Sequence, residues 1–249
     1  MIFVESLIKN LKRNNINFFT GVPDSILKKL SYHLENLPQR KHIIATNEGA
    51  AVSIGIGYHL ATKKIPCIYL QNSGLSNAMN PLISIANSRV YSIPLVMIIG
   101  WRGSPYSADE PQHLEKGKIT TKLLRLLNIK YCILKNKKDL IKFNRILRTS
   151  KKKNKIVAGL ICKGTLETKK KNKKKSSDGT ILRSYFIKEF LNLIPKKSKI
   201  ISTTGYTSRE LMQIRTETKN EKGSDFYMVG GMGHTSSVAT GYAMMSNSK

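Results

Sequence analysis

The sequence predicts an α/β protein: a six-stranded parallel sheet with helices on both faces, followed by the start of a second, similar domain. Short apolar runs alternate with longer amphipathic stretches over residues 1–165. This alternation is typical of parallel strands that are joined by helical crossovers. The runs are apolar at most consecutive positions, as expected for strands that helices cover on both faces.

The elements of this first domain can be justified in chain order. Ile2, Leu7 and Leu11 share one face of the first helix, and Asp24 is an N-cap residue type that precedes the second. The third helix is rich in Gly and Ala, and the fourth strand is the most apolar. The strands are expected at residues 16–20, 42–46, 66–70, 94–99, 131–134 and 156–161. The helices are expected at residues 2–14, 25–36, 48–62, 73–88, 113–127 and 139–148.

The rest of the chain predicts a linker and part of another domain. Residues 166–180 are polar and rich in lysine, which is typical of a linker between a domain at 1–165 and one at 181–249. Helices are expected at 181–194, 207–217 and 235–246, with strands at 199–202 and 226–229. Because two strands bury too little surface for a core of this type, the second domain is expected to be incomplete.

The charge of the chain is strongly basic and unevenly distributed. The 249 residues include 43 Lys and Arg against 15 Asp and Glu, a net charge of +28. Residues 111–180 carry 22 of the basic and 4 of the acidic residues. A nucleic-acid-binding protein is one interpretation of such a charge, but the run at 169–175 contains no aromatic residue on which bases could stack. A solvated linker is the interpretation that we favour, without a nucleic-acid partner.

Three further features narrow the class of protein. Cys67, Cys132 and Cys162 lie far apart in apolar runs and form neither a metal motif nor a disulfide framework. No apolar stretch approaches the ~20 residues that a membrane-spanning helix needs. The basic residues near the N-terminus follow the apolar ones, which is the wrong order for a secretory signal. We therefore expect a cytoplasmic protein without a membrane partner.

The carboxyl ends of the predicted strands carry the residues of chemical interest, because ligands of open parallel sheets bind there. Glu48 lies at a strand-to-helix junction beside small residues. It is either a carboxylate that the helix dipole favours or a general acid/base in a cleft. Arg102 is either a surface residue or a clamp for an anionic substrate. His113 and His234 are two further candidates. Considered alone, each is either a structural histidine or a catalytic one.

Two segments have the composition of ligand-binding loops. The loop before the fourth helix contains Asn72, Ser73, Gly74 and Asn77. Its backbone N–H groups and amide side chains can bind a ligand, or the loop is an ordinary helix start. A glycine-rich turn precedes the last helix and suits phosphate oxygens, although the pattern alone is weakly specific. This turn comprises Gly231, Met232, Gly233 and His234.

Taken together, these segments resemble one family. From about residue 5 onward the chain contains, in order, GVPDS, NEGAA, QNSGLSNAMNPL, GWRG, DEPQH, STTGYTSREL and GGMGHTSS. This set resembles the phosphonopyruvate decarboxylases, which are thiamine-diphosphate enzymes related to the sulfopyruvate decarboxylases and, more distantly, to the acetolactate synthase group. The resemblance implies a thiamine-diphosphate-binding fold, with a pyrimidine-binding domain at 1–165 and a diphosphate-binding domain beginning at 181.

The resemblance also implies roles for particular residues. Glu48 would hydrogen-bond the pyrimidine ring of thiamine diphosphate, and the cofactor would accept the electrons released when a 2-keto acid loses carbon dioxide. Asp24, His113 and His234 would transfer protons and orient the substrate. Ser25 and Arg102 would bind the substrate, 3-phosphonopyruvate. The remaining expected cofactor contacts are Asn72, Ser73, Gly74, Asn77, Thr204, Gly205, Gly231, Met232, Gly233 and His234.

Some features of the family are altered or missing. Tyr206 stands where a lysine is expected, and the Gly-Asp-Gly motif that binds Mg²⁺ is not found before the chain ends. We therefore assign no metal ligand, and we expect the chain alone to be inactive, either because it is truncated or because it needs a partner chain. The family implies at least a homodimer. Three alternatives remain: a sulfopyruvate decarboxylase, a decarboxylase of some other 2-keto acid, or a non-catalytic fragment that only dimerises.

Overall fold

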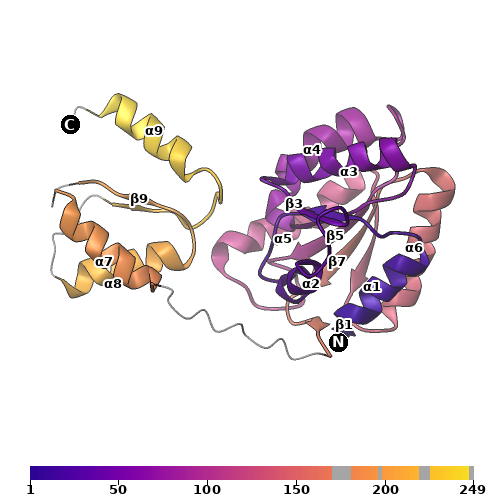
Figure 1. Cartoon of the computed structure of the whole chain (residues 1–249), viewed down its shortest axis with the longest axis horizontal. Helices are drawn as coiled ribbons and strands as arrows, with labels where there is room; N and C mark the ends of the chain where they lie inside the picture. The colour runs from indigo at the N-terminus through magenta and orange to yellow at the C-terminus, as the bar shows by residue number, and fades with distance from the viewer. Residues whose placement is uncertain (170–180, 196–197, 219–224, 247–249) are drawn as a thin grey trace. The chain divides into compact units, whose positions relative to one another are not determined.

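The computed structural model describes residues 1–169, 181–195, 198–218 and 225–246 (Figure 1). Its internal contacts divide the chain into two compact units, residues 1–172 and 173–249. Most of the lysine run at 169–175, and most of the linker that we expect at 166–180, lie outside the described residues. Each unit is described by itself.

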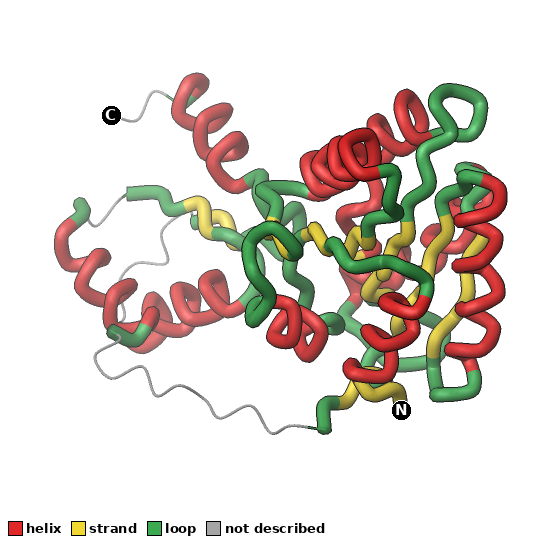
Figure 2. Tube along the Cα trace, turned by 45° about the vertical axis from the view of Figure 1, so that its right-hand side comes forward, coloured by secondary structure: helices red, strands yellow, loops and turns green. Residues whose placement is uncertain are grey.

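The first unit contains a parallel sheet of six strands, as the sequence predicts. The strand order is β3-β2-β4-β5-β7-β6, and every neighbouring pair is parallel. Figure 2 shows these strands lying side by side among the helices. The strands are β2 (Phe19–Gly21), β3 (His42–Ile44), β4 (Cys67–Gln71), β5 (Val96–Trp101), β6 (Lys130–Leu134) and β7 (Val157–Cys162).

Helices cover both faces of the sheet, and alternate residues of each strand point to opposite layers. On β5, Val96 and Ile98 pack into the cluster that contains residues of α1 (Val4–Arg13), α2 (Lys28–Leu34) and α6 (Asp139–Lys153). Met97 and Ile99 pack into the cluster with α3 (Glu48–Thr62), α4 (Leu75–Pro81) and α5 (Pro111–Leu126). The strands are therefore buried on both sides, which explains their continuous apolar character.

Two expectations about single elements are corrected. Residues 2–3 do not belong to the first helix, because Ile2–Phe3 forms β1 and pairs in parallel with β8 (Leu166–Glu167), inside the segment expected to be a linker. The helix expected at 73–88 is interrupted. A short 3₁₀ helix, η1 (Asn72–Gly74), precedes α4, and a π-helical turn, η2 (Leu82–Ala86), follows it. Pro81 ends α4; because proline donates no backbone hydrogen bond, it disrupts the regular ladder there.

The second unit is smaller, and its described core is modest. It contains α7 (Arg183–Leu193), β9 (Ile201–Ser202), α8 (Tyr206–Glu217), β10 (Phe226–Tyr227) and α9 (Thr235–Met245), and β9 and β10 pair in parallel. Arg215 and Asp225 form a buried ion pair beside this core, with Nε and Oδ2 3.0 Å apart. None of the helices in the described ranges of either unit combines the length and apolar character that a membrane-spanning helix requires.

Candidate functional site

The topology of the first unit has a switch point between β2 and β4. These strands are neighbours, but β2 leads through α2 to β3 on one side, whereas β4 leads through α4 to β5 on the other. Such a switch point leaves a ligand crevice at the carboxyl ends of the two strands. Asp24 follows β2 and Gln71 ends β4, and the side-chain amide of Gln71 donates a hydrogen bond to Oδ1 of Asp24.

Glu48 begins α3 and reaches across to the start of α4. Asn47 caps α3, because its Oδ1 accepts a hydrogen bond from the backbone N–H of Ala50 at 2.8 Å. The half-buried Glu48 accepts a hydrogen bond at Oε2 from Nδ2 of Asn77 at 2.9 Å. Its carboxylate lies directly over Gly74, where an added Cβ would stand 2.0 Å from Oε1. Glycine at 74 therefore provides the space in which the Glu48 carboxylate sits.

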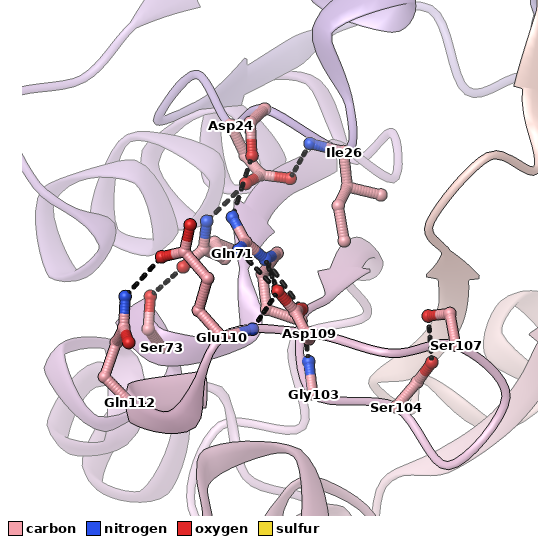
Figure 3. Close-up of polar contacts among 12 residues, drawn as sticks. Asp24, Ile26, Gln71, Ser73, Gly103, Ser104, Ser107, Asp109, Glu110 and Gln112 are labelled. Atoms are coloured by element: carbon pink, nitrogen blue, oxygen red, sulfur yellow. Dashed lines mark hydrogen bonds and ion pairs between the residues drawn. The ribbon is translucent and has the colours of Figure 1, made fainter. Parts of the chain in front are cut away.

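A second chain of hydrogen bonds orients Asp24 (Figure 3). Ser73 Oγ donates to Oε1 of Gln71 at 2.6 Å, so the nitrogen of the Gln71 amide faces Asp24. Oδ2 of Asp24 accepts from the backbone N–H groups of Ile26 at 3.0 Å and Leu27 at 3.1 Å. Asp24 is 7% exposed. These contacts hold the carboxylate beside the switch point in a single orientation.

Arg102 follows β5 directly and forms an ion pair with Asp109. Nε of Arg102 lies 2.8 Å from Oδ2 of Asp109, and Nη2 lies 2.5 Å from Oδ1. Burial would raise the pKa of Asp109, but the hydrogen bonds from Arg102 and from two backbone N–H groups hold it well below its usual range. The hydrogen bond to Asp109 raises the pKa of Arg102. Nη1 of Arg102 donates to Ser25 Oγ at 3.3 Å.

Two further predicted residues, Asn72 and His113, lie close to Arg102. Asn72 is buried, and its amide donates to the carbonyl of Arg102 at 3.0 Å and to Oγ1 of Thr120 at 2.8 Å. Its side chain thus ties η1 to the loop after β5 and to α5, and contact with a cofactor stays a prediction. His113 is half-buried, and burial, with the nearby charge of Arg102, lowers its pKa. The neutral imidazole is therefore favoured at neutral pH.

The other predicted residues lie together in the second unit. Thr203, Thr204 and Gly205 follow β9, and the turn from Gly231 to His234 follows β10. Because β9 and β10 are parallel neighbours, both segments lie at the same edge of the pair. Gly205, Gly231 and Gly233 have positive φ angles of 90°, 71° and 87°. In this conformation, which glycine adopts readily, the turn can present backbone N–H groups to an anion.

The predicted residues therefore form two groups, one in each unit, and the positions of the two units relative to one another are not determined. Two residues that contact the first group, Gln71 and Asp109, were not among the predicted site residues. Both are polar residues at or after the end of a strand, and this position is the signal by which they could have been found. Among the residues that the structure describes, no three His, Cys, Asp or Glu side chains are placed to hold a metal ion.

Comparison with known proteins identifies the family of the chain. Residues 1–124 match the family model described as thiamine pyrophosphate enzyme, N-terminal TPP binding domain. The chain is 30% identical to phosphonopyruvate decarboxylase of Streptomyces viridochromogenes, over 98% of this chain and 64% of the relative. It is 32% identical to sulfopyruvate decarboxylase subunit alpha of Methanococcus maripaludis, over 51% of this chain and 74% of that subunit. The chain thus spans less than two thirds of the length of its phosphonopyruvate decarboxylase relative.

A solved structure shares the fold. The crystal structure of benzoylformate decarboxylase from Polynucleobacter necessarius matches 79% of this chain and 37% of that protein, with a TM-score of 0.51 and 17% sequence identity. At this level of identity, the likeness concerns the fold alone. The sequence relatives and the family model carry the assignment further. The chain belongs to the thiamine-diphosphate-dependent enzymes, in the group that contains the phosphonopyruvate and sulfopyruvate decarboxylases.

Proposed function

We propose that this protein takes part in the decarboxylation of 3-phosphonopyruvate to phosphonoacetaldehyde and carbon dioxide, with thiamine diphosphate as cofactor. The observation that carries the proposal is the placement of Glu48 at the start of α3, over Gly74 and hydrogen-bonded to Asn77. When bound, thiamine diphosphate supplies the electron sink that the loss of carbon dioxide requires. The chain supplies binding, orientation and proton transfer.

Glu48 would hold the pyrimidine ring of the cofactor. Oε2 already accepts one hydrogen bond from Asn77, so Oε1 remains to accept a hydrogen bond from a ring nitrogen. The Asn77 contact orients the carboxylate, and Gly74 leaves it room. The half-buried position allows a ligand to reach the carboxylate from outside. A fixed acceptor of this kind supports the cofactor assignment better than any other single group in the first unit.

Asp24 and His113 would handle protons near the reacting carbon. Asp24 stands at the switch-point crevice, and its orientation is set by Gln71 and by two backbone N–H groups. Burial and the charge of Arg102 lower the pKa of His113, so its neutral imidazole would serve as a proton acceptor. His234 and the glycine-rich turn of the second unit would meet the diphosphate.

The substrate class follows from two observations of different kinds. Relatives of the chain act, by their names, on phosphonopyruvate and on sulfopyruvate. Both compounds are 2-keto acids with a second strong acid group. Arg102 and Ser25 offer hydrogen-bond donors at the edge of the crevice that suit such a group. Sulfopyruvate or another 2-keto acid is the alternative substrate.

Assembly into at least a homodimer is part of the proposal. In this basic chain, residues 65–88 contain no charged side chain, and Glu48 is the only Asp, Glu, Lys or Arg between 48 and 62. These stretches include α3, α4 and η2, and Leu60 on α3 and Ile83 on η2 are exposed. Segments with so few charges and with exposed apolar residues suit burial against a second copy. Sedimentation of a monomer at high concentration would contradict this part.

Magnesium is part of the proposal only because the family that the chain resembles implies it. The described residues offer no fitting cluster, so no step is assigned to a metal ion. Because the chain matches 64% of the Streptomyces relative, turnover is tested in a fusion of this chain to the part of that relative which it does not match.

The test measures carbon dioxide release by that fusion with 3-phosphonopyruvate, sulfopyruvate and pyruvate. The proposal expects the highest kcat/KM with 3-phosphonopyruvate and loss of turnover in Glu48→Ala. Glu115→Gln is the matched control, because Glu115 is an exposed carboxylate on α5 whose only described ion pair is with exposed Lys118. Equal turnover by Glu48→Ala and the control would remove Glu48 from its role, and a preference for sulfopyruvate would change the substrate.

A further inference from the structure

The guanidinium group of Arg102 has two edges, and only one of them is committed to a carboxylate. Nε lies 3.0 Å and 2.8 Å from the two oxygens of Asp109, and Nη2 lies 2.5 Å from Oδ1. This is the two-pronged arrangement in which arginine binds carboxylates most strongly. One whole edge of the guanidinium is therefore occupied inside the protein.

Asp109 is itself fixed from several directions. Its side chain is 1% exposed, and its oxygens also accept the backbone N–H groups of Gly103 at 2.8 Å and Glu110 at 2.9 Å. The carboxylate thereby closes the loop that begins after β5, drawing the two ends of that loop together (Figure 3). Because so little of the carboxylate faces solvent, its contacts are directed almost entirely to the protein. Asp109 is thus placed to hold a neighbour and not to bind a ligand.

The other edge of Arg102 faces the loop after β2. Nη1 lies 3.3 Å from Ser25 Oγ, next to Asp24 at the switch-point crevice, and the Arg102 side chain is 17% exposed. The contact with Ser25 is long for a hydrogen bond and can be exchanged for a stronger acceptor. An acid group of a ligand is such an acceptor. The Nη1 edge is therefore the part of Arg102 that remains for recognition.

We propose that Asp109 is a positioning residue that holds Arg102 by its Nε and Nη2 edge, leaving the Nη1 edge beside Ser25 to meet the second acid group of the substrate. The positioning half of this proposal is that Asp109 holds Arg102, and the recognition half is that the Nη1 edge meets the acid group of the substrate. The recognition half rests on the proposed function. Because Asp109 cancels the charge of Arg102, the pair acts through directed donors more than through net charge. A lysine at 102 could not reproduce this, since it has no second edge.

The positioning half is tested without any substrate. In protein labelled with ¹⁵N-arginine, the Nε–H of Arg102 should exchange with solvent at least about tenfold more slowly than those of exposed arginines, because it is buried in a hydrogen bond. Asp109→Asn should abolish this protection, and Glu115→Gln should preserve it. Protection that survives in Asp109→Asn, or that is absent from the wild-type chain, would overturn the positioning role.

The recognition half is tested by a double-mutant cycle on 3-phosphonopyruvate binding, measured by NMR titration of the chain. Asp109→Ala and Arg102→Ala should each weaken binding by about tenfold or more, since each removes or misplaces a hydrogen bond between charged groups. In the Arg102→Ala background, Asp109→Ala should cost less than about threefold, because Asp109 acts through Arg102.

The outcomes separate the two proposals. Additive losses in the cycle would mean that Asp109 does not act through Arg102, and would overturn the recognition half. If the wild-type chain binds neither 3-phosphonopyruvate nor sulfopyruvate, the recognition half and the proposed function both fail, while the exchange experiment still decides the positioning role. Should Asp109→Ala not fold, as its thermal unfolding would show, Asp109→Asn takes its place in the cycle.

Discussion

Replacing Gly74 by alanine should separate the stability of the first unit from its ability to bind the cofactor. An added Cβ would stand 2.0 Å from Oε1 and 2.2 Å from Cδ of Glu48. Carbon and oxygen atoms in contact are normally more than 3 Å apart, so the carboxylate must move by at least about 1 Å. The half-buried Glu48 side chain can make that movement, but its hydrogen bond to Asn77 is then lost.

The expected change in stability is small. Because the Asn77 hydrogen bond is exposed and water competes for both partners, its loss costs only about 0.5–1.5 kcal/mol. The backbone at Gly74, with φ of −85° and ψ of −2°, is open to alanine, and removing a glycine from the unfolded chain returns about 0.4–1 kcal/mol. The free energy of unfolding should therefore change by less than about 1 kcal/mol, or roughly 2–4 °C in Tm.

The expected change in cofactor binding is much larger. A displaced Glu48 cannot make its hydrogen bond to the pyrimidine ring, and hydrogen bonds to charged groups contribute about 1.5–3 kcal/mol. At 1.4 kcal/mol for each factor of ten, affinity for thiamine diphosphate should fall about 10- to 100-fold. The assay is titration of the chain with thiamine diphosphate, followed by NMR, alongside thermal unfolding.

Gly57→Ala is the matched control, because Gly57 lies on the same helix as Glu48 and an added Cβ there meets nothing within 4 Å. This variant should bind the cofactor normally and gain up to about 1 kcal/mol in stability, since alanine favours a helix. If Gly74→Ala binds thiamine diphosphate as tightly as Gly57→Ala does, the placement of Glu48 over Gly74 has no bearing on the cofactor.

Three further substitutions test the packing and charge of the first unit by urea unfolding. Gly21→Ala should destabilise the first unit by about 1–3 kcal/mol or more, because the new Cβ would stand 2.0 Å from the backbone oxygen of buried Tyr69. Unchanged stability would refute this close approach. Thr20→Val should stabilise it by about 1 kcal/mol, because Oγ1 is buried without a hydrogen-bond partner in the described structure, and a loss would contradict that. Arg102→Ala should cost about 3–5 kcal/mol at pH 7, because it leaves the Asp109 carboxylate buried without its cation. Since the pKa of Asp109 is lowered in the folded state, this stability exists above about pH 4 and is lost as the pH falls further. The free energies of unfolding of wild type and Arg102→Ala should therefore converge in acid. A difference that stays constant with pH would exclude the ion pair as its source.

The sheet could be predicted from the sequence because its signal is local. Each strand is a short apolar run, and burial on both faces makes that run nearly continuous. The pairing of Ile2–Phe3 with Leu166–Glu167 could not be predicted, because two residues carry no pattern and the partners are more than 160 residues apart. The interruption at Pro81 was visible as a proline, but the apolar spacing on both sides of it favoured a continuous helix.

The positions of the candidate site residues could be predicted in part for the same reason, while their roles stay predictions. Strand ends can be read from the sequence, so residues such as Glu48 and Asp24 could be identified as candidates at one edge of the sheet. The partners that orient them could not, because hydrogen bonds between loops depend on tertiary packing. Asn72 shows this most clearly: its amide joins the loop after β5 to α5 through Thr120, a residue 48 positions away that no motif marks.

The central claim is that Glu48 meets the pyrimidine ring of thiamine diphosphate, and the carboxylate itself can report that contact. In protein labelled with ¹³C at glutamate carboxylates, the Glu48 signal is the one that disappears in Glu48→Ala. We expect this signal to shift as thiamine diphosphate is added, while the signal of exposed Glu115 stays in place. A Glu48 signal that does not move at cofactor concentrations that shift other resonances of the protein would contradict the account.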